Sequence, residues 1–202
     1  FGDLLIGTAR CSGLSSITRG LVCAGRTSGG VVNTIQYVTI ASTGNASDFG
    51  DVTQARTFPA SCASPTRGVI SGGQDGSSNG YNTIDYVTIA NTGNATDFGD
   101  LSGTRFYHTS ASSSTRGLMA GGYQGGAINT IEYVTIANTG NTTDFGDLTV
   151  ARYKPMAASS QTKAVVASGN SSDVSMDFVT IATTGNGADY GDLTVYGQSG
   201  AG

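Results

Sequence analysis

The chain is built from a repeat whose length is constant outside one segment. An aromatic residue followed by Gly-Asp recurs at Phe1, Phe49, Phe98, Phe145 and Tyr190, at spacings of 48, 49, 47 and 45 residues. Each copy contains one segment of variable length, with 7, 8, 6 and 4 residues at 26–32, 74–81, 123–128 and 170–173. Without that segment every copy is 41 residues long. We therefore expect a repeated structural unit that carries one variable loop.

Composition favours strands and narrows the possible partners. Thr, Ile, Val and Tyr are abundant, which is typical of β-sheets. With a net charge of −4 the chain has no basic footprint, so we expect no nucleic acid partner. No apolar run approaches 18 residues, so we expect no membrane insertion. Cys23 and Cys62 occupy positions that mostly hold small residues in other copies, for example Cys23 against Ala120, so the three cysteines are interpreted as small buried fillers.

The second copy shows the expected strands most clearly. Strand-like residues at 57–64, 68–71, 83–90 and 97–105 are separated by turn residues. The third of these strands is apolar on both faces, with Ile84 and Tyr86 on one side and Val87 and Ile89 on the other. A sandwich would leave one polar face, whereas the blades of a propeller are covered on both sides. The sequence predicts an all-β propeller of four-stranded antiparallel blades.

The aromatic residue of each third strand is predicted to lie in a blade core. These residues are Tyr37, Tyr86, Tyr133 and Phe178. We expect a single repeat domain over 1–202, with repeats at 1–48, 49–97, 98–144 and 145–189 and a terminal strand at 190–202, cut from a longer chain. The F-G-D strand occurs five times but the other strands four times, so one terminal copy, at 1–6 or 190–195, is surplus. We expect it to pair with a neighbouring copy or a further blade.

The order of motifs resembles the kelch repeat, in which a hydrophobic strand, a glycine pair, a variable loop, a Tyr-containing strand and a later aromatic residue follow one another. Gly72-Gly73, Tyr86 and Phe98 match this order, as do Gly121-Gly122, Tyr133 and Phe145. The chain departs from it in having Phe or Tyr in place of the usual Trp, and Ser168-Gly169 in the last copy. The resemblance implies a kelch-like propeller.

A more specific resemblance is to repeat-rich virion proteins of bacteriophages, notably marine cyanophages. The phrases N-T-I-D-Y-V-T-I-A-N-T-G-N-A-T-D-F-G-D-L and S-S-S-T-R-G are similar to theirs. This resemblance implies a virion structural protein of a tail or fibre, located in the extracellular virion. The alternative is a secreted bacterial carbohydrate-binding or adhesion propeller.

The sequence shows no catalytic constellation. Its lone histidine, His108, lies in a variable stretch, and no His, Cys or carboxylate cluster has metal-ligand spacing. We therefore expect no enzyme, metal or cofactor, and a galactose-oxidase or sialidase activity lacks its ligands and acid boxes. The repeated aspartates, such as Asp51, are interpreted as turn residues. Arg19, Arg67 and Arg116, with Lys163 in the last copy, are predicted to tie neighbouring blades by hydrogen bonds.

The variable segments suggest a binding face. In an up-and-down blade the variable loop and the connection to the next blade emerge on the same side, and both vary between copies. Candidate binding residues on this side are Tyr81, Phe106, Tyr107, His108, Tyr123 and Tyr153. Exposed aromatic rings suit stacking on sugars or filling partner pockets. Expected partners are other virion proteins, copies of this chain, or a host surface glycan or protein; the alternative is that the loops have merely drifted.

Overall fold

The computed structural model describes residues 2–170 and 173–197. Phe1, residues 171–172 of the fourth variable segment and residues 198–202 of the terminal segment lie outside the described residues. Within these ranges the secondary structure consists of strands, arranged in four antiparallel four-stranded sheets. No helix in the described ranges is long and apolar enough to cross a membrane.

The sheets follow one another along the chain, and in each one the strands pair in chain order. The first contains β1 (Ser12–Ser15), β2 (Arg19–Thr27), β3 (Gly30–Thr39) and β4 (Ser47–Asp51). The second contains β5 (Ala60–Ala63), β6 (Arg67–Ser71), β7 (Thr83–Thr88) and β8 (Thr96–Asp100). The third contains β9 (Thr109–Ser112), β10 (Arg116–Ala120), β11 (Ile128–Thr135) and β12 (Thr143–Arg152). The fourth contains β13 (Met156–Ser159), β14 (Lys163–Ala167), β15 (Ser175–Thr180) and β16 (Ala188–Asp192).

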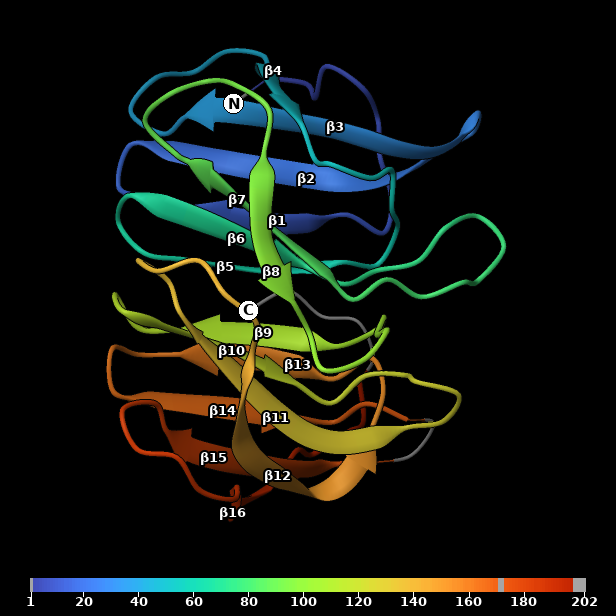
Figure 1. The fold of residues 1–202 in the computed structure, drawn as a ribbon, viewed down its shortest axis with the longest axis vertical. Coiled ribbons are helices and arrows are strands. Elements are labelled where there is room, and N and C mark those ends of the chain that lie inside the picture. Colours follow the sequence, from blue (N-terminus) through green and yellow to red (C-terminus); the bar gives the residue numbers. More distant parts are fainter. Residues whose placement is uncertain (1, 171–172, 198–202) are drawn as a thin grey trace.

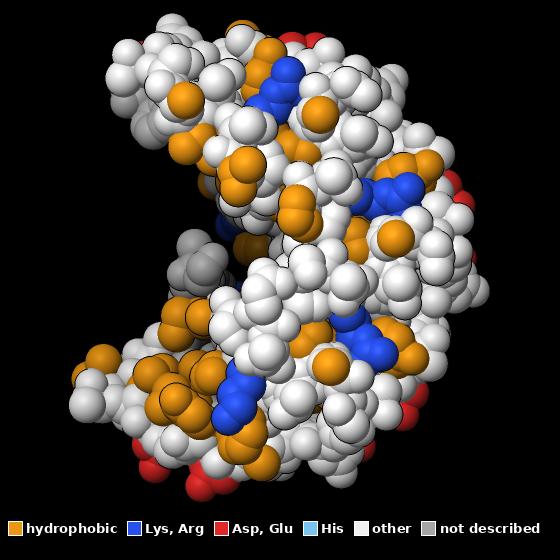
Figure 2. All heavy atoms as spheres, turned by 90° about the vertical axis from the view of Figure 1, so that its left-hand side faces the viewer, with side chains coloured by type: hydrophobic (Ala, Val, Ile, Leu, Met, Phe, Trp, Pro, Cys, Tyr) orange, Lys and Arg blue, Asp and Glu red, His pale blue; other side chains and the backbone are white. Residues whose placement is uncertain are grey.

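The architecture is a four-bladed β-propeller, which confirms the predicted fold class and the antiparallel blades (Figure 1). The first strands of successive blades, β1, β5, β9 and β13, lie side by side at the centre. The F-G-D strand ends each sheet, as β4, β8, β12 and β16. Figure 2 shows that the blades form an arc that is open on one side.

One expected strand is not formed. Residues 2–6 were predicted as a surplus F-G-D strand, but none of them is in a strand, so that prediction is wrong. The backbone of Gly2 and Asp3 instead bonds to the turn between β3 and β4 of the first blade. The last copy completes its own blade, because β16 pairs with β15.

The core consists of three clusters, each at a seam between two blades. Ile84 and Phe98 of the second blade pack against Met119, Val134 and Ile136 of the third. Equivalent clusters fill the seam between the first and second blades and that between the third and fourth. The opposite face of β7, with Val87 and Ile89, belongs to the first of these clusters. The apolar positions on both faces of β7 are therefore buried, as the sequence predicted. Tyr37, Tyr86 and Tyr133 are half-buried and pack against these clusters, whereas Phe178, also half-buried, is in none of the three, so its predicted place in a blade core is wrong.

A backbone link joins each F-G-D strand to the T-G-N turn of the next blade. Gly93 N–H donates to the carbonyl of Phe49 (2.6 Å), and Asp51 N–H donates to Asn94 Oδ1 (3.0 Å). The next two seams repeat this arrangement. Gly50 has a φ of +141°, and a Cβ there would overlap the backbone of Gly93, so the close approach requires glycine. The aspartate of the motif takes part in this link through its main-chain groups: Asp51 N–H donates to Asn94, and the Asp51 carbonyl accepts from Ala95 N–H.

The arginines after the S-T turns tie the blades together, as predicted. Arg19 donates to the carbonyl of Ile89 in the second blade (2.9 Å), and its guanidinium lies 4.6 Å from the ring centroid of Tyr37. Arg67 and Arg116 make the same contacts across the next two seams. A single side chain thus joins the turn of one blade, the ring of the same blade and the backbone of the next.

A second set of arginines, which the sequence reasoning did not single out, is buried with acidic partners. Arg56 pairs with Asp85, Arg105 with Glu132 (3.0 Å) and Arg152 with Asp177 (3.1 Å). The acid follows a β-bulge between the third and fourth strands of its blade. In the first blade neutral residues stand at both positions, Thr8 and Gln36, and Gln36 bonds to the backbone of Ile6.

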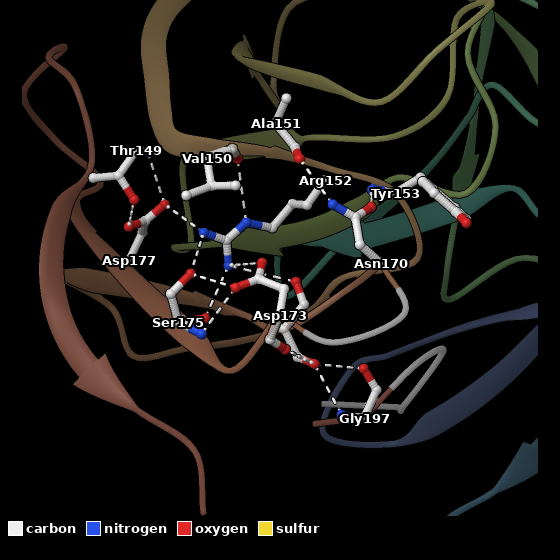
Figure 3. A network of polar contacts seen from close by, with 11 residues as sticks. Thr149, Val150, Ala151, Arg152, Tyr153, Asn170, Asp173, Ser175, Asp177 and Gly197 are labelled. Atoms are coloured by element: carbon white, nitrogen blue, oxygen red, sulfur yellow. Dashed lines mark hydrogen bonds and ion pairs between the residues drawn. The ribbon is translucent and has the colours of Figure 1, made fainter. Parts of the chain in front are cut away.

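Figure 3 shows the pair of the fourth blade in its network. The guanidinium of Arg152 also donates to Ser175 Oγ (3.0 Å), and Asp177 accepts from the backbone of Thr149 (3.0 Å). These bonds satisfy groups that would be costly to bury alone. They hold the chain just before Tyr153, where it leaves one blade and enters the next.

The buried pairs generate the first prediction. Glu132→Gln leaves the Arg105 guanidinium buried without a compensating charge, so we expect the free energy of unfolding to fall by about 3–5 kcal/mol, measured by urea denaturation. The double variant Arg105→Thr, Glu132→Gln copies the neutral pair of the first blade and should recover most of the loss. A double variant as unstable as the sum of its two single variants would contradict this account.

The glycine of the F-G-D strand generates the second prediction. Gly99 has a φ of +142° and faces the backbone of Gly140, whereas Gly191, at the same repeat position in the last blade, has a φ of +114° and open space at its Cβ. Both alanine variants carry backbone strain, but only Gly99→Ala also forces two blades apart. We expect Gly99→Ala to cost about 1–3 kcal/mol more than Gly191→Ala in the same denaturation assay. Equal costs would show that blade approach is not the constraint.

Candidate functional site

The two variable parts of each repeat lie side by side, as the sequence predicted. Isolated β-bridges join the connection between blades to the start of the variable loop, as Ala9 with Arg26, Thr57 with Gln74 and Phe106 with Tyr123. In the fourth blade Asn170 N–H donates to the carbonyl of Tyr153 (3.1 Å). We call this side of the molecule, formed by the connections and the loops, the variable face.

Five aromatic rings form a continuous cluster on the variable face. Phe58 lies 4.3 Å from Tyr107 between ring centroids, and Phe106 lies 4.8 Å from Tyr107 and 5.2 Å from Tyr123. Tyr153 closes the cluster at 6.0 Å from Tyr123 and 6.3 Å from Tyr107. These five residues are the aromatic cluster. They come from three connections and one variable loop, so blade packing brings them together.

Four residues at one repeat position, called the rim residues, line a cavity at the centre of the arc. Arg10, Phe58, Tyr107 and Lys154 have φ values of 58°, 56°, 57° and 57°. A left-handed backbone is unfavourable for such side chains, and strain of this kind persists where the surroundings impose it, often at functional sites. In the three connections between blades the rim residue lies two positions after a buried arginine, Arg56, Arg105 or Arg152. The buried ion pairs therefore anchor the segments that carry the rim.

Among the rim residues, two cations at the ends of the arc flank two aromatic residues. The Arg10 guanidinium lies 5.0 Å from the ring centroid of Phe58, and Lys154 Nζ lies 4.9 Å from that of Tyr107. Backbone bonds join the same pairs, from Phe58 N–H to the Arg10 carbonyl (2.8 Å) and from Lys154 N–H to the Tyr107 carbonyl (2.7 Å). Cations held against ring faces retain donors for a ligand while the rings offer apolar area.

The rim opens onto a cavity of about 710 Å³ along the centre of the arc. Its walls come from the first strands of all four blades, including Ser12, Ser61, Ser110 and Ala157, and from β2 and β3 of the first blade, including Val22 and Val38. Among its lining residues the charged side chains are Arg10 and Lys154, and none is acidic. Aromatic rings and two cations suit a ligand that has apolar faces for stacking or carries a negative charge.

The structure places some of the binding residues predicted from the sequence in the aromatic cluster and others outside it. Tyr107, Tyr123 and Tyr153 are half-buried members of the aromatic cluster. Phe106 belongs to it but is only 8% exposed, so its expected exposure is wrong. Tyr81 is half-buried and bonds to the backbone of Gly73, and no described ring contact joins it to the cluster. Arg10, Phe58 and Lys154 were missed, although their shared repeat position was a usable signal.

His108 is buried, which corrects its expected place as a solvated loop residue on the binding face. Its Nε2 lies 2.9 Å from Ser71 Oγ, in the seam between the second and third blades. The same repeat position holds Pro59 and Pro155, which are also buried. Burial, and then the nearby charge of Arg105, lowers the pKa of His108 to about 3. The connection turns every other side chain inward, so Tyr107 faces the rim while Phe106 and His108 fill the interior.

Two of the three cysteines are buried fillers, as predicted, whereas Cys11 is only half-buried. Cys23 and Cys62 are free thiols packed in seam clusters, and burial raises the pKa of each to about 12. In the described part of the chain no group of three or more His, Cys, Asp or Glu residues is placed to hold a metal ion.

The burial of His108 generates a pH prediction. The folded protein keeps the ring neutral, whereas the unfolded chain protonates it near its ordinary pKa of 6.5. Protonation therefore favours unfolding, and the stability present above pH 6.5 is lost as pH falls toward 3. From pH 7 to pH 5 we expect this group to remove about 2 kcal/mol from the free energy of unfolding. The variant His108→Gln should lose that much less over the same interval, and an unchanged pH dependence would refute the assignment.

The comparisons add no relative from which a role can be transferred. No protein-family model matches the chain, and no curated protein sequence is similar to it. The four-bladed propeller and the geometry of its variable face are therefore the basis for assigning a function.

Proposed function

We propose that the chain is a non-enzymatic bacteriophage virion protein, of a tail or fibre, that presents its variable face to a receptor or partner. The observation that carries the recognition role is the aromatic cluster with Arg10 and Lys154 beside the central cavity. The virion role is supported by the resemblance of the repeat phrases to cyanophage structural proteins. The kelch-like order of motifs supports the same kind of repeat module.

The contrast between the two sides of the blades favours recognition over drift. Length differences between repeats fall in the loops of the variable face, while the S-T-R-G and T-G-N turns are nearly identical. Those turns make the links between blades, so their sequence is fixed by packing. The variable face is free of that constraint, yet it gathers five rings and two cations in one place. Drift alone would not favour such a cluster.

A surface glycan suits this cluster. Sugar rings present apolar C–H faces that stack on aromatic side chains, and their hydroxyl groups bond to donors such as the Arg10 guanidinium and Lys154 ammonium groups. Acidic sugars would gain further from the two cations. A protein receptor would use the same rings as anchors.

The recognition role is tested by glycan-array binding. The double variant Tyr123→Ala, Tyr153→Ala removes two rings of the cluster, and we expect at least about tenfold weaker binding, which corresponds to about 1.4 kcal/mol. Tyr81→Ala is the matched control, since Tyr81 is a half-buried tyrosine of the same face outside the cluster. Unchanged binding by the double variant, with the fold verified by thermal melting, would remove the cluster from recognition.

The virion role is tested separately. Antibodies raised against the chain should label the tails or fibres of purified phage particles in immunogold electron microscopy. Labelling of the bacterial culture medium without particles would favour the secreted adhesion propeller instead.

A further inference from the structure

The fourth blade has a face that is covered in every other blade. Phe49, Phe98 and Phe145 are each 2% exposed under the next blade, whereas Tyr190 at the same repeat position is 58% exposed. Val165 and Met176 on the same face are half-buried, although their equivalents in β6 and β7, Val69 and Ile84, are fully buried. Figure 2 shows hydrophobic side chains gathered at the lower end of the arc. We call this surface the trailing face.

The first blade has the complementary face exposed at the other end of the arc. Ile40 is 42% exposed, whereas its equivalents Ile89, Ile136 and Ile181 are 1%, 0% and 1% exposed in their seams. Val22 and Val38 beside it are half-buried, although Ile70 and Val87 at the same positions are buried. This surface, around β2 and β3, is the leading face. Each seam within the molecule is a trailing face packed on a leading face.

The polar links of a seam are also free at the trailing face. Gly191 has a positive φ, as Gly50 and Gly99 do, but a Cβ at Gly191 would point into open space. A Cβ at Gly50 or Gly99 would instead meet the T-G-N turn of the next blade. Lys163 stands where Arg19 and Arg67 donate to the carbonyl of an isoleucine in the next blade. In a further seam that carbonyl would belong to Ile40.

At the leading face, residues 2 and 3 hold the turn between β3 and β4. Asp3 N–H donates to Asn45 Oδ1 (3.0 Å), and Ala46 N–H donates to the Asp3 carbonyl (2.8 Å), which are the bonds that Asp51 makes to the next turn. The next residue does not match the internal seams. Leu4 is 40% exposed, while Val52, Leu101 and Leu148 at its repeat position are 2–3% exposed. Residues 2–6 thus fill the hydrogen bonds of the turn but leave the apolar face open.

We propose that the trailing face binds the leading face of a second copy of this chain, with Tyr190-Gly191-Asp192 replacing residues 2–4 at the turn around Asn45. The three internal seams provide the template, because they join the same positions with the same residue types. Such a contact uses two different surfaces, so repetition either closes a ring of copies or extends a filament. Both outcomes bury the apolar surface at the ends of the arc.

Site-specific cross-linking tests the contact. In the internal seams a Cβ at Gly117 would lie 2.6 Å from Cys62 Sγ. The equivalent positions of the proposed seam are Gly20 on the leading face and Ala158 on the trailing face. In a background of Cys11→Ser, Cys23→Ala and Cys62→Ala, one preparation carries Gly20→Cys and another Ala158→Cys. Residues of other repeats already show that alanine fits at positions 23 and 62.

The two preparations are mixed under mild oxidation and analysed by non-reducing electrophoresis and mass spectrometry of the disulfide. We expect a disulfide between positions 20 and 158 that forms far faster on mixing than any disulfide within either preparation alone. Gly117→Cys in a protein that retains Cys62 serves as the positive control for an internal seam. No mixed disulfide, or rates no higher than those of an Ala158→Cys and Ile17→Cys mixture, would overturn the proposal, since Ile17 is 91% exposed on a turn outside either face.

Two further variants separate the contact from chance collision. Tyr190→Glu places a charge on the trailing face and should slow the mixed disulfide at least about tenfold, whereas Ile17→Glu should leave it unchanged. Asp3→Pro removes the N–H that holds residues 2–6 at the turn and should accelerate the reaction. Equal effects of the two glutamate variants would overturn the seam, and an unchanged rate for Asp3→Pro would overturn the displacement of residues 2–4. A double variant with Gly20→Cys and Ala158→Cys that cross-links only at monomer mass would show closure within one chain instead.

Discussion

The packing of one blade on the next is the interaction on which the rest of this protein depends. Every blade has two apolar faces, and a four-stranded sheet of this size cannot bury both by itself. Repeat architectures share this property, in which stability is a sum of unit and interface terms. The three seam clusters bury the third strands on both sides, as Ile84 and Val87 of β7 show. At the two ends of the arc the equivalent residues Ile40 and Tyr190 are exposed, so apolar surface there is still uncovered.

The seams also determine where the chain can vary. The F-G-D strand and the T-G-N turn meet so closely that glycine is required at Gly50 and its equivalents. The arginines after the S-T turns reach across the seam to backbone carbonyls. The loops on the other side take no part in these links. A rigid scaffold with one unconstrained face is the usual arrangement of binding proteins, because recognition then changes without loss of the fold.

The buried ion pairs connect the scaffold to that face. Arg152 and its partners hold the chain one residue before Tyr153 and two before Lys154 (Figure 3). A charge pair in the interior is not an efficient source of stability, but it is demanding in its geometry. The strained backbone of the rim residues depends on such fixed neighbours. In the first blade Gln36 bonds to the backbone of Ile6 and Thr8 Oγ1 is buried without a hydrogen-bond partner among the described residues, and there residues 2–6 lie on the surface.

Much of the fold was predictable because its causes are local or periodic. The constant 41-residue frame and the glycine-rich turns predict repeated blades. The two apolar faces of the third strand predict that each blade packs against its neighbours. The tie made by Arg19 was predictable from its place after a turn. The pairing of Arg105 with Glu132 was missed, because the partners are far apart in sequence and the signal lies in their joint replacement by Thr8 and Gln36 in the first repeat. His108 was misplaced because a variable segment was taken as an exposed one.

The sequence by itself determined the repeat, the strand order within a blade and the side on which variation gathers, since these follow from spacing and side-chain alternation. Only the tertiary structure decided which variable residues meet. The aromatic cluster joins Phe58, Phe106, Tyr107, Tyr123 and Tyr153 through the curvature of the arc, and no local pattern encodes that curvature. The structure also decided that residues 2–6 imitate a strand without forming one, because a strand needs a paired neighbour and the edge they reach offers only a turn.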